Sequence, residues 1–502
     1  MTKLQTRPFQ QEARHRINAD LNSGRNPVFV SPTGTGKTFT ACEVIKDRVN
    51  LGERVFVLTP QEEIFQQWLL ECEKHKISYG FINQSGVNGR NKKVYICMPL
   101  SLNNLLSVLP DYFKPDLIIT DEAHHSQADT WQNIYNYYSK SKRLGLTATP
   151  QRTDGRGLDS TYDTIVQTIE MPEAINSDPP YLAKPLIIVP EQYKLKVPIQ
   201  NGEYDPREQA EQLGKTQIIG DIISRYTDIF AGLPVLVACS TFEHAKIMTA
   251  EFRKAGWKFE HIHSRLASAD RRGMLRGIKN GDLNGLCTVG IGIEGMDIPG
   301  LYGLIWLRRT LSITVYLQFI GRVLRPSEGK IYGTILDPVG NVFIHGSPEL
   351  RRKWTLQGRD SGSGEPETIA PKMKICPVCS VMNATVNILC HICSHDFRTE
   401  PPAGRGRKLP RIIDGKLVVL DADELSEERE KIRENLKKQR DRHNAEKTGE
   451  GSGIDSTEAN EAEPSAGYAG GSRITQADKL ELLKTGLEKK KGLFAEAVKN
   501  YL

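Results

Sequence analysis

The sequence predicts an α/β protein with two tandem parallel-sheet lobes, followed by a small cysteine-rich module and a polar tail. Short runs rich in Val, Ile and Leu alternate with longer helical patterns over residues 28–147, and the alternation returns over residues 235–336. This pattern is typical of strand–helix–strand units, which form parallel sheets covered by helices. Beyond about residue 358 the apolar runs give way to a polar composition that contains two close pairs of cysteines.

The first series contains five expected strands, each bounded by turn or helix signals. They are Val28–Val30, Val55–Leu58, Val94–Cys97, Leu117–Thr120 and Leu144–Leu146. Ser31, Asp121 and Thr147 each come directly after one of these strands. Because parallel sheets bind ligands at the carboxyl ends of their strands, we expect these three residues to gather at one edge.

The second series contains five further strands, and a connector rich in helix and strand breakers separates the two series. These strands are Val235–Ala238, Phe259–Ile262, Leu286–Thr288, Leu304–Leu307 and Ile331–Leu336. We therefore expect a first lobe at 1–170, a connector at 171–214, a second lobe at 215–358, a linker at 359–373, a zinc ribbon at 374–398, a basic and charged segment at 399–445, a disordered linker at 446–473 and a C-terminal helix at 474–502.

Length and charge restrict the class of protein. With 502 residues the chain can form about three folded units. Its formal net charge of +6 is too small for a polycation, but it leaves room for a locally basic nucleic-acid groove. The sequence shows neither a signal peptide nor an apolar run long enough to span a membrane, so we expect a soluble cytoplasmic protein.

The segment Ser31–Thr38 has the residue types that a triphosphate requires. Glycines leave the backbone N–H groups free to face phosphates, a lysine pairs with the β and γ oxygens, and a hydroxyl holds Mg²⁺. A strand precedes the segment and a helix follows it, although Ser31 stands where the strict pattern has glycine. A glycine-rich turn without a ligand is the alternative. The expected nucleotide contacts are Thr33, Gly34, Thr35, Gly36, Lys37 and Thr38.

Two carboxylates follow the expected strand Leu117–Thr120. Phosphoryl transfer needs a ligand for the metal ion and a group that orients or deprotonates the attacking water. We expect Asp121 to hold Mg²⁺ together with Thr38, and Glu122 to act on the water. Arg322 and Arg325, three residues apart on an expected helix, can neutralise charge that develops on the γ-phosphate.

Six segments occur in a fixed order that resembles the superfamily 2 helicases of the DEAD/DEAH-box type, over about residues 1–358. They are Arg7-Pro8-Phe9-Gln10, Ser31–Thr38, Asp121-Glu122-Ala123-His124, Thr147-Ala148-Thr149, Glu294-Gly295-Met296-Asp297 and Gln318–Arg325. The resemblance implies two RecA-like lobes and ATP hydrolysis coupled to a lobe movement on nucleic acid.

The same resemblance assigns roles to single residues. It places Arg7 and Gln10 at the adenine, which favours ATP over GTP, and Gly295 and Asp297 at the ribose. Arg322 and Arg325 correspond to arginine fingers, and Gln318 and His124 to residues that connect the nucleotide with the nucleic acid. The expected contacts with the nucleic-acid backbone are Thr59, Pro60, Ser240 and Thr288.

The cysteine pairs Cys376/Cys379 and Cys390/Cys393 have the spacing of two zinc knuckles. We expect a structural Zn²⁺ held by four thiolates. Disulfides are disfavoured in a reducing cytosol, and a catalytic zinc would need an open ligand position. A helicase core followed by such a ribbon resembles RadD-type and phage-encoded helicases. The lysines and arginines that flank the ribbon either contact the phosphates of a nucleic acid or form a basic turn exposed to solvent.

Beyond the ribbon, residues 411–420 are expected to form a hairpin, and the C-terminal helix either docks on its own chain or binds a protein partner. We interpret the chain as an ATP- and Mg²⁺-dependent DNA helicase or translocase with a zinc ribbon. Its substrate would be single-stranded, duplex or forked DNA, in the host cytoplasm if a phage encodes it. An ATP-gated clamp or scaffold without unwinding, and an RNA helicase, are the alternatives.

Overall fold

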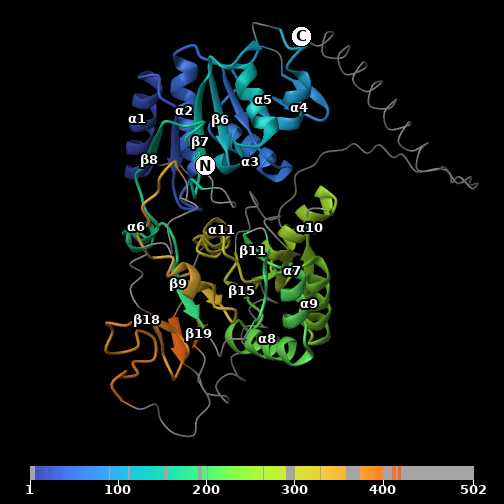
Figure 1. Cartoon of the computed structure of the whole chain (residues 1–502), viewed down its shortest axis with the longest axis vertical. Helices are drawn as coiled ribbons and strands as arrows, with labels where there is room; N and C mark the ends of the chain where they lie inside the picture. Colours follow the sequence, from blue (N-terminus) through green and yellow to red (C-terminus); the bar gives the residue numbers. More distant parts are fainter. Residues whose placement is uncertain are drawn as a thin grey trace, which may run out of the picture.

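The computed structural model describes residues 6–399 except 90, 111–112, 152–156, 190–194, 201, 264, 290–299, 328–329 and 358–372, together with two strands at 410–413 and 416–419. Two α/β lobes lie one above the other, and the cysteine module (residues 373–399) lies beside the second lobe (Figure 1). This arrangement confirms the fold class expected from the sequence.

Lobe 1 is built on an eight-stranded sheet of order β4-β3-β5-β2-β6-β7-β1-β8. All neighbours are parallel except β3 and β4. Its strands are β1 (Pro27–Val30), β2 (Val55–Leu58), β3 (Tyr79–Asn83), β4 (Gly86–Asn88), β5 (Val94–Cys97), β6 (Leu117–Asp121), β7 (Lys142–Thr147) and β8 (Thr164–Gln167). The helices of this lobe are α1 (Pro8–Asn22), α2 (Lys37–Asn50), α3 (Glu62–Lys74), α4 (Pro99–Leu105) and α5 (Asp129–Tyr137).

Lobe 2 has a six-stranded, fully parallel sheet of order β13-β14-β12-β15-β16-β9. Its strands are β9 (Lys184–Ile188), β12 (Val235–Cys239), β13 (Phe259–Ile262), β14 (Gly285–Val289), β15 (Gly303–Leu307) and β16 (Tyr332–Leu336). The helices are α7 (Pro206–Leu213), α8 (Thr216–Ile229), α9 (Phe242–Lys254), α10 (Ser268–Lys279), α11 (Ile313–Val323) and α12 (Asn341–His345).

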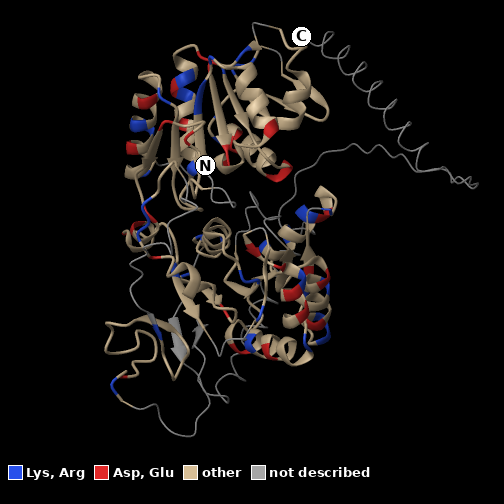
Figure 2. Cartoon of the chain, viewed as in Figure 1, with Lys and Arg blue, Asp and Glu red and all other residues tan. Residues whose placement is uncertain are grey.

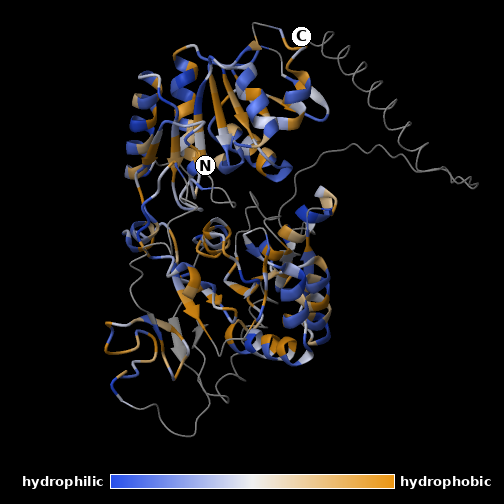
Figure 3. Cartoon of the chain, in the orientation of Figure 1, coloured by the Kyte–Doolittle hydropathy of each residue, from blue (hydrophilic) through white to orange (hydrophobic). Residues whose placement is uncertain are grey.

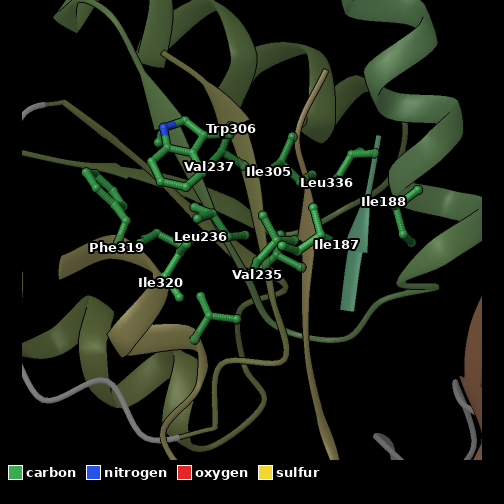
Figure 4. Packing of buried hydrophobic residues seen from close by; sticks show 14 of the residues in the cluster. Ile187, Ile188, Val235, Leu236, Val237, Ile305, Trp306, Phe319, Ile320 and Leu336 are labelled. Carbon is green, nitrogen blue, oxygen red and sulfur yellow. The ribbon is translucent and has the colours of Figure 1, made fainter. Parts of the chain in front are cut away.

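Strand β9 lies within residues 171–214, the stretch expected to connect the lobes. Between lobe 1 and β9 the chain forms the short helix α6 (Met171–Asn176), and after β9 it forms the small ribbon β10 (Ile199–Gln200) and β11 (Glu203–Tyr204). Ile187 and Ile188 of β9 pack with the strands of lobe 2 (Figure 4). Much of this stretch therefore belongs to lobe 2 by its contacts.

The cysteine module packs on the edge of the lobe 2 sheet. Its strands β17 (Met373–Ile375) and β18 (Met382–Ala384) are antiparallel. Val381 forms a bridge with Ile188, and the Val189 N–H donates to the Ser380 carbonyl at 3.0 Å. Val381 and Met382 are buried in the same core as the lobe 2 strands. The expected hairpin is present as antiparallel β19 (Pro410–Ile413) and β20 (Lys416–Val419). The expected C-terminal helix lies outside the described residues.

Hydropathy explains this layering. The strands of both sheets are hydrophobic, whereas the outer faces of the helices are hydrophilic (Figure 3). Acidic and basic residues are mixed along helices such as α1 and α9 (Figure 2). None of the helices in the described part of the chain is long and apolar enough to cross a membrane.

Candidate nucleotide site

The loop between β1 and α2 forms a phosphate cradle. Gly34 and Gly36 have φ angles of 90° and 93°, a region that favours glycine. The Thr35 hydroxyl lies 2.6 Å from the Pro32 carbonyl and 2.6 Å from Ser31 Oγ, and Lys37 Nζ donates to the Ser31 carbonyl at 3.1 Å. The serine in place of glycine thus helps to hold the loop. The loop leads directly into the N-terminus of α2, where backbone N–H groups favour anions.

Gln10 contacts this loop. Its Nε2 donates to the Thr35 carbonyl at 3.0 Å, and its Oε1 accepts from the Arg7 N–H at 3.0 Å. The Arg7 guanidinium lies 4.5 Å from the ring centroid of Tyr181, which follows α6. In this structure Gln10 therefore braces the phosphate loop, and Arg7 joins lobe 1 to the segment that leads into lobe 2.

The two carboxylates stand at the end of β6, beside the lysine of the loop. Burial, followed by the charge of Glu122, raises the pKa of Asp121 to about 6. Burial also lowers the pKa of Lys37, while the two carboxylates act in the opposite direction. Glu122 has φ of 49°, which is strained for a residue with a side chain, and its Oε2 lies 3.5 Å from His124 Nδ1. Burial thus perturbs Lys37 and Asp121, and Glu122 lines the same cavity, an arrangement found in many catalytic sites.

Lobe 2 closes the site from the other side. A cavity of about 370 Å³ is lined by the phosphate loop and both carboxylates from lobe 1, and by Gln318, Arg322 and Arg325 from lobe 2. Gly321 on α11 lies so close to Thr33 that an added Cβ would be 2.6 Å from Thr33 Cβ. The structure therefore brings most of the expected residues from distant parts of the sequence into one cavity, whereas Arg7, Gln10, Thr35 and His124 do not line it.

Thr147-Ala148-Thr149 contributes to the contact between the lobes. The hydroxyls of Thr149 and Thr314 on α11 lie 3.2 Å apart, and the Thr314 hydroxyl lies 3.2 Å from the Gln151 carbonyl. The Thr147 hydroxyl donates to the Thr149 carbonyl at 2.8 Å, which shapes the turn. The segment after β7 thus touches the same helix that carries Gln318 and Arg322.

The residues expected to contact nucleic acid lie at the carboxyl ends of strands, but their hydroxyls are buried. Thr59, Ser240 and Thr288 are 0 %, 5 % and 1 % exposed. The Ser240 hydroxyl donates to the Leu307 carbonyl at 3.0 Å. Pro60 is half-buried beside Thr59. Gly295 and Asp297, the expected ribose contacts, lie outside the described residues.

The four cysteines of the module converge as the sequence predicts. Their sulfur atoms all lie within 4.8 Å of one another. Each Cys-x-x-Cys pair is followed by a serine with positive φ, 59° at Ser380 and 57° at Ser394, whose N–H donates to the carbonyl of Cys376 or Cys390 at 2.9 Å. Two equivalent turns that present four sulfurs fit the tetrahedral set that zinc prefers.

Several residues that line the nucleotide cavity have no counterpart in the motifs. They are Phe39 on α2, Ile64, Gln67 and Glu71 on α3, and Pro326 after α11. Trp68, also on α3, donates from Nε1 to Asp121 Oδ2 at 2.7 Å. The apolar periodicity of α3 shows which side of this helix is buried, but it does not show that the helix reaches the nucleotide.

Both lobes of the chain are similar to known protein families. Residues 3–152 match the family described as "Type III restriction enzyme, res subunit", and residues 215–327 match "Helicase conserved C-terminal domain". The chain is also 31 % identical, over 376 residues, to the "51.5 kDa protein" of Lactococcus phage (isolate 7-9), covering 74 % of this chain and 78 % of the relative. The chain belongs to the superfamily 2 helicases.

Other relatives of this superfamily 2 helicase are more distant. It is 27 % identical to the candidate mitochondrial ATP-dependent helicase irc3 of Schizosaccharomyces pombe, over 69 % of this chain and 60 % of that one. Identity to the DNA 3'-5' translocase XPB2 of Sulfurisphaera tokodaii is also 27 %, over 31 % of this chain and 33 % of that one. Among solved structures, the type ISP restriction-modification enzyme LlaBIII bound to DNA has a TM-score of 0.49 at 18 % identity, over 66 % of this chain and 28 % of that one.

Helicase domains of this superfamily imply ATP hydrolysis with Mg²⁺, and the donor atoms of the site fit both. The Thr38 hydroxyl and the Asp121 carboxylate line one cavity, and oxygen ligands of this kind suit Mg²⁺. Lys37 and the loop N–H groups suit the phosphates.

Proposed function

We propose that this superfamily 2 helicase couples ATP hydrolysis to movement along DNA or to its unwinding. The observation that carries the proposal is the cavity whose walls come from both lobes. Lys37 would hold the β and γ phosphates, Asp121 and Thr38 would hold Mg²⁺, and Glu122 would orient the attacking water. Arg322 and Arg325 would stabilise the transition state. Because these groups meet only when the lobes are together, each turnover requires the lobes to close and then reopen.

Two observations favour DNA over RNA as the nucleic acid along which the protein moves. The first lobe matches a restriction-enzyme family, and one relative is a DNA translocase. Thr59, Pro60, Ser240 and Thr288, at strand ends of both lobes, mark the proposed groove. Since the side chains of Thr59, Ser240 and Thr288 are buried, the contacts that fix the position of the strand would come from main-chain groups at these turns.

We further propose that the cysteine module binds one structural Zn²⁺ through Cys376, Cys379, Cys390 and Cys393, which makes the chain RadD-like in organisation. In a cytoplasm, which is that of the host if a phage encodes the chain, thiols stay reduced, and such a site is favoured over disulfides. We also propose that residues 474–502, which lie outside the described part of the chain, bind a protein partner.

The deciding experiment measures ATP turnover with single-stranded DNA, duplex DNA, forked DNA and RNA, followed by strand displacement on the best activator. We expect DNA to stimulate turnover and RNA to do so weakly. Stimulation by RNA alone would make the protein an RNA helicase. Turnover without either displacement or translocation would make it an ATP-gated clamp. The Glu122→Gln variant, which should bind ATP without hydrolysing it, controls for contaminating ATPases.

A further inference from the structure

Trp68 is a fully buried aromatic residue next to the nucleotide cavity, and none of the motifs includes it. It lies on the inner face of α3 with Ile64, Phe65 and Cys72. Its indole ring is 0 % exposed, and its Nε1 lies 2.7 Å from Asp121 Oδ2. Trp68 therefore contacts Asp121, the carboxylate that would hold Mg²⁺ in the proposed function.

The two oxygens of Asp121 are held by different donors. Oδ2 accepts from the Trp68 indole, and Oδ1 accepts from the Glu122 N–H at 2.9 Å. An indole N–H can only donate, and a bond to an ionised carboxylate is stronger than one between neutral groups. Two donors on separate oxygens prevent the carboxylate from rotating, and each oxygen keeps a lone pair for a further ligand.

We propose that Trp68 is a positioning residue of the nucleotide site, whose indole N–H orients the Asp121 carboxylate that, together with Thr38, would hold Mg²⁺. The inference rests on the proposed function of this site. Partners of this kind, which bond to a metal ligand rather than to the metal, commonly change metal affinity about 10–100-fold when they are removed.

Packing alone does not account for a tryptophan here. A phenylalanine would also cover the apolar side of α3, and it would bring no polar atom into the core. A buried N–H is costly unless it is bonded, so its presence beside a buried carboxylate indicates a use for the bond.

The position of α3 gives the bond a second consequence. The helix begins three residues after Thr59, and Glu63 in its first turn forms an ion pair with Arg271 on α10 of lobe 2, at 2.5 Å. A shift of α3 that follows lobe movement would therefore also move the indole that holds Asp121. The helix α3 is thus involved both in the orientation of the Asp121 carboxylate and in the closure of the lobes.

The test compares Trp68→Phe with a matched control, Trp257→Phe. Trp257 in lobe 2 donates from its indole to the Thr227 hydroxyl at 3.3 Å, remote from the site. Calorimetric titration measures the affinity for a non-hydrolysable ATP analogue in Mg²⁺ and in EDTA. For Trp68→Phe we expect the affinity for the analogue in EDTA to be unchanged. The increase in affinity that Mg²⁺ produces should be smaller than in the wild type by about tenfold or more. Trp257→Phe should keep the full gain.

A double-mutant cycle with Asp121→Asn separates the bond from packing. Trp68→Phe should add no further loss of Mg²⁺ dependence once the carboxylate is gone. A full Mg²⁺ gain in Trp68→Phe, or equal losses in the presence and absence of the carboxylate, would overturn the inference. Because this titration contains no nucleic acid, it stays informative if DNA fails to stimulate the wild-type protein, a result that would refute only the proposed function.

Discussion

At the scale of single residues, the proposed function depends on charged groups that line one cavity. Lys37, Asp121 and Glu122 line one cavity, and burial changes the pKa values of Lys37 and Asp121; electrostatic interactions between such groups are stronger than in bulk water. Each of these residues supplies a chemical group whose role the other two residues cannot take over. Substitutions at these positions should therefore change distinct steps of the reaction.

We predict that Lys37→Ala abolishes ATP hydrolysis by removing the charge that faces the β and γ phosphates, whereas Glu122→Gln keeps ATP binding and loses turnover. Nucleotide titration and steady-state hydrolysis distinguish the two defects. Normal turnover in Glu122→Gln would assign the water to another group. Lys46→Ala, which changes a partly exposed lysine further along α2, is the control and should behave as wild type.

His244 is a buried histidine that should make the stability of lobe 2 depend on pH. Burial lowers its pKa to about 4, and its Nδ1 accepts from the Ser240 N–H at 3.4 Å. An unfolded histidine has a pKa of about 6.5, so between these values the unfolded chain binds a proton that the folded chain does not. The contribution to the free energy of unfolding is complete above about pH 6.5 and is lost as the pH falls toward 4.

We therefore expect lobe 2 to lose about 1–3 kcal/mol of stability between pH 7 and pH 4.5. His244→Gln should flatten this dependence in urea unfolding followed at several pH values. His15→Gln, on the exposed side of α1, should retain it. An unchanged slope in His244→Gln would assign the pH dependence to other groups.

At the scale of elements, α11 is the part of lobe 2 that meets the nucleotide loop. It carries Gln318 and Arg322, it lies 3.2 Å from Thr149 through the Thr314 hydroxyl, and Gly321 allows it to approach Thr33. A helix surface without a side chain at this point permits the contact. Gly321 thus allows the closest approach that α11 makes to Thr33 of the loop.

We predict that Gly321→Ala separates the lobes and lowers turnover at least tenfold, because the new Cβ would be 2.6 Å from Thr33 Cβ. ATP binding to lobe 1 should persist. Gly273→Ala on α10, where an added Cβ meets nothing within 4 Å, is the matched control and should leave turnover unchanged. Hydrolysis by Gly321→Ala at the wild-type rate would show that the close contact is not needed for catalysis.

At the scale of the whole molecule, the cysteine module is continuous with lobe 2. Its Val381 and Met382 are buried against the same core as β9, and Cys376, Cys379 and Cys390 belong to that core. A small unit of this kind would depend on the proposed Zn²⁺ for its folding. The edge of lobe 2 should consequently depend on the metal as well.

Chelation of zinc, or truncation after residue 357, should therefore destabilise lobe 2 by a few kcal/mol, since burying a Val or Met side chain contributes about 1.5–3 kcal/mol. Calorimetry of the full chain with and without a chelator, together with metal analysis, measures both parts. Zinc at less than about half an equivalent in reduced protein would contradict the metal site. An unchanged transition of lobe 2 after chelation would show that the packed edge persists without the metal. Chelation should leave the transition of lobe 1 in place.

The sequence by itself determined the two α/β lobes, ten of their strands, the phosphate loop and the convergence of four cysteines. These features follow from local patterns, because hydrophobic periodicity, strand-end position and metal-ligand spacing act over short stretches of chain. The tertiary structure alone decided that β9 belongs to the sheet of lobe 2, that Gln10 braces the loop, and that Trp68 reaches Asp121. Each of these depends on contacts between residues distant in sequence. The local pattern around Trp68 predicts only a buried side chain, and its hydrogen bond to Asp121 forms only when α3 packs against β6.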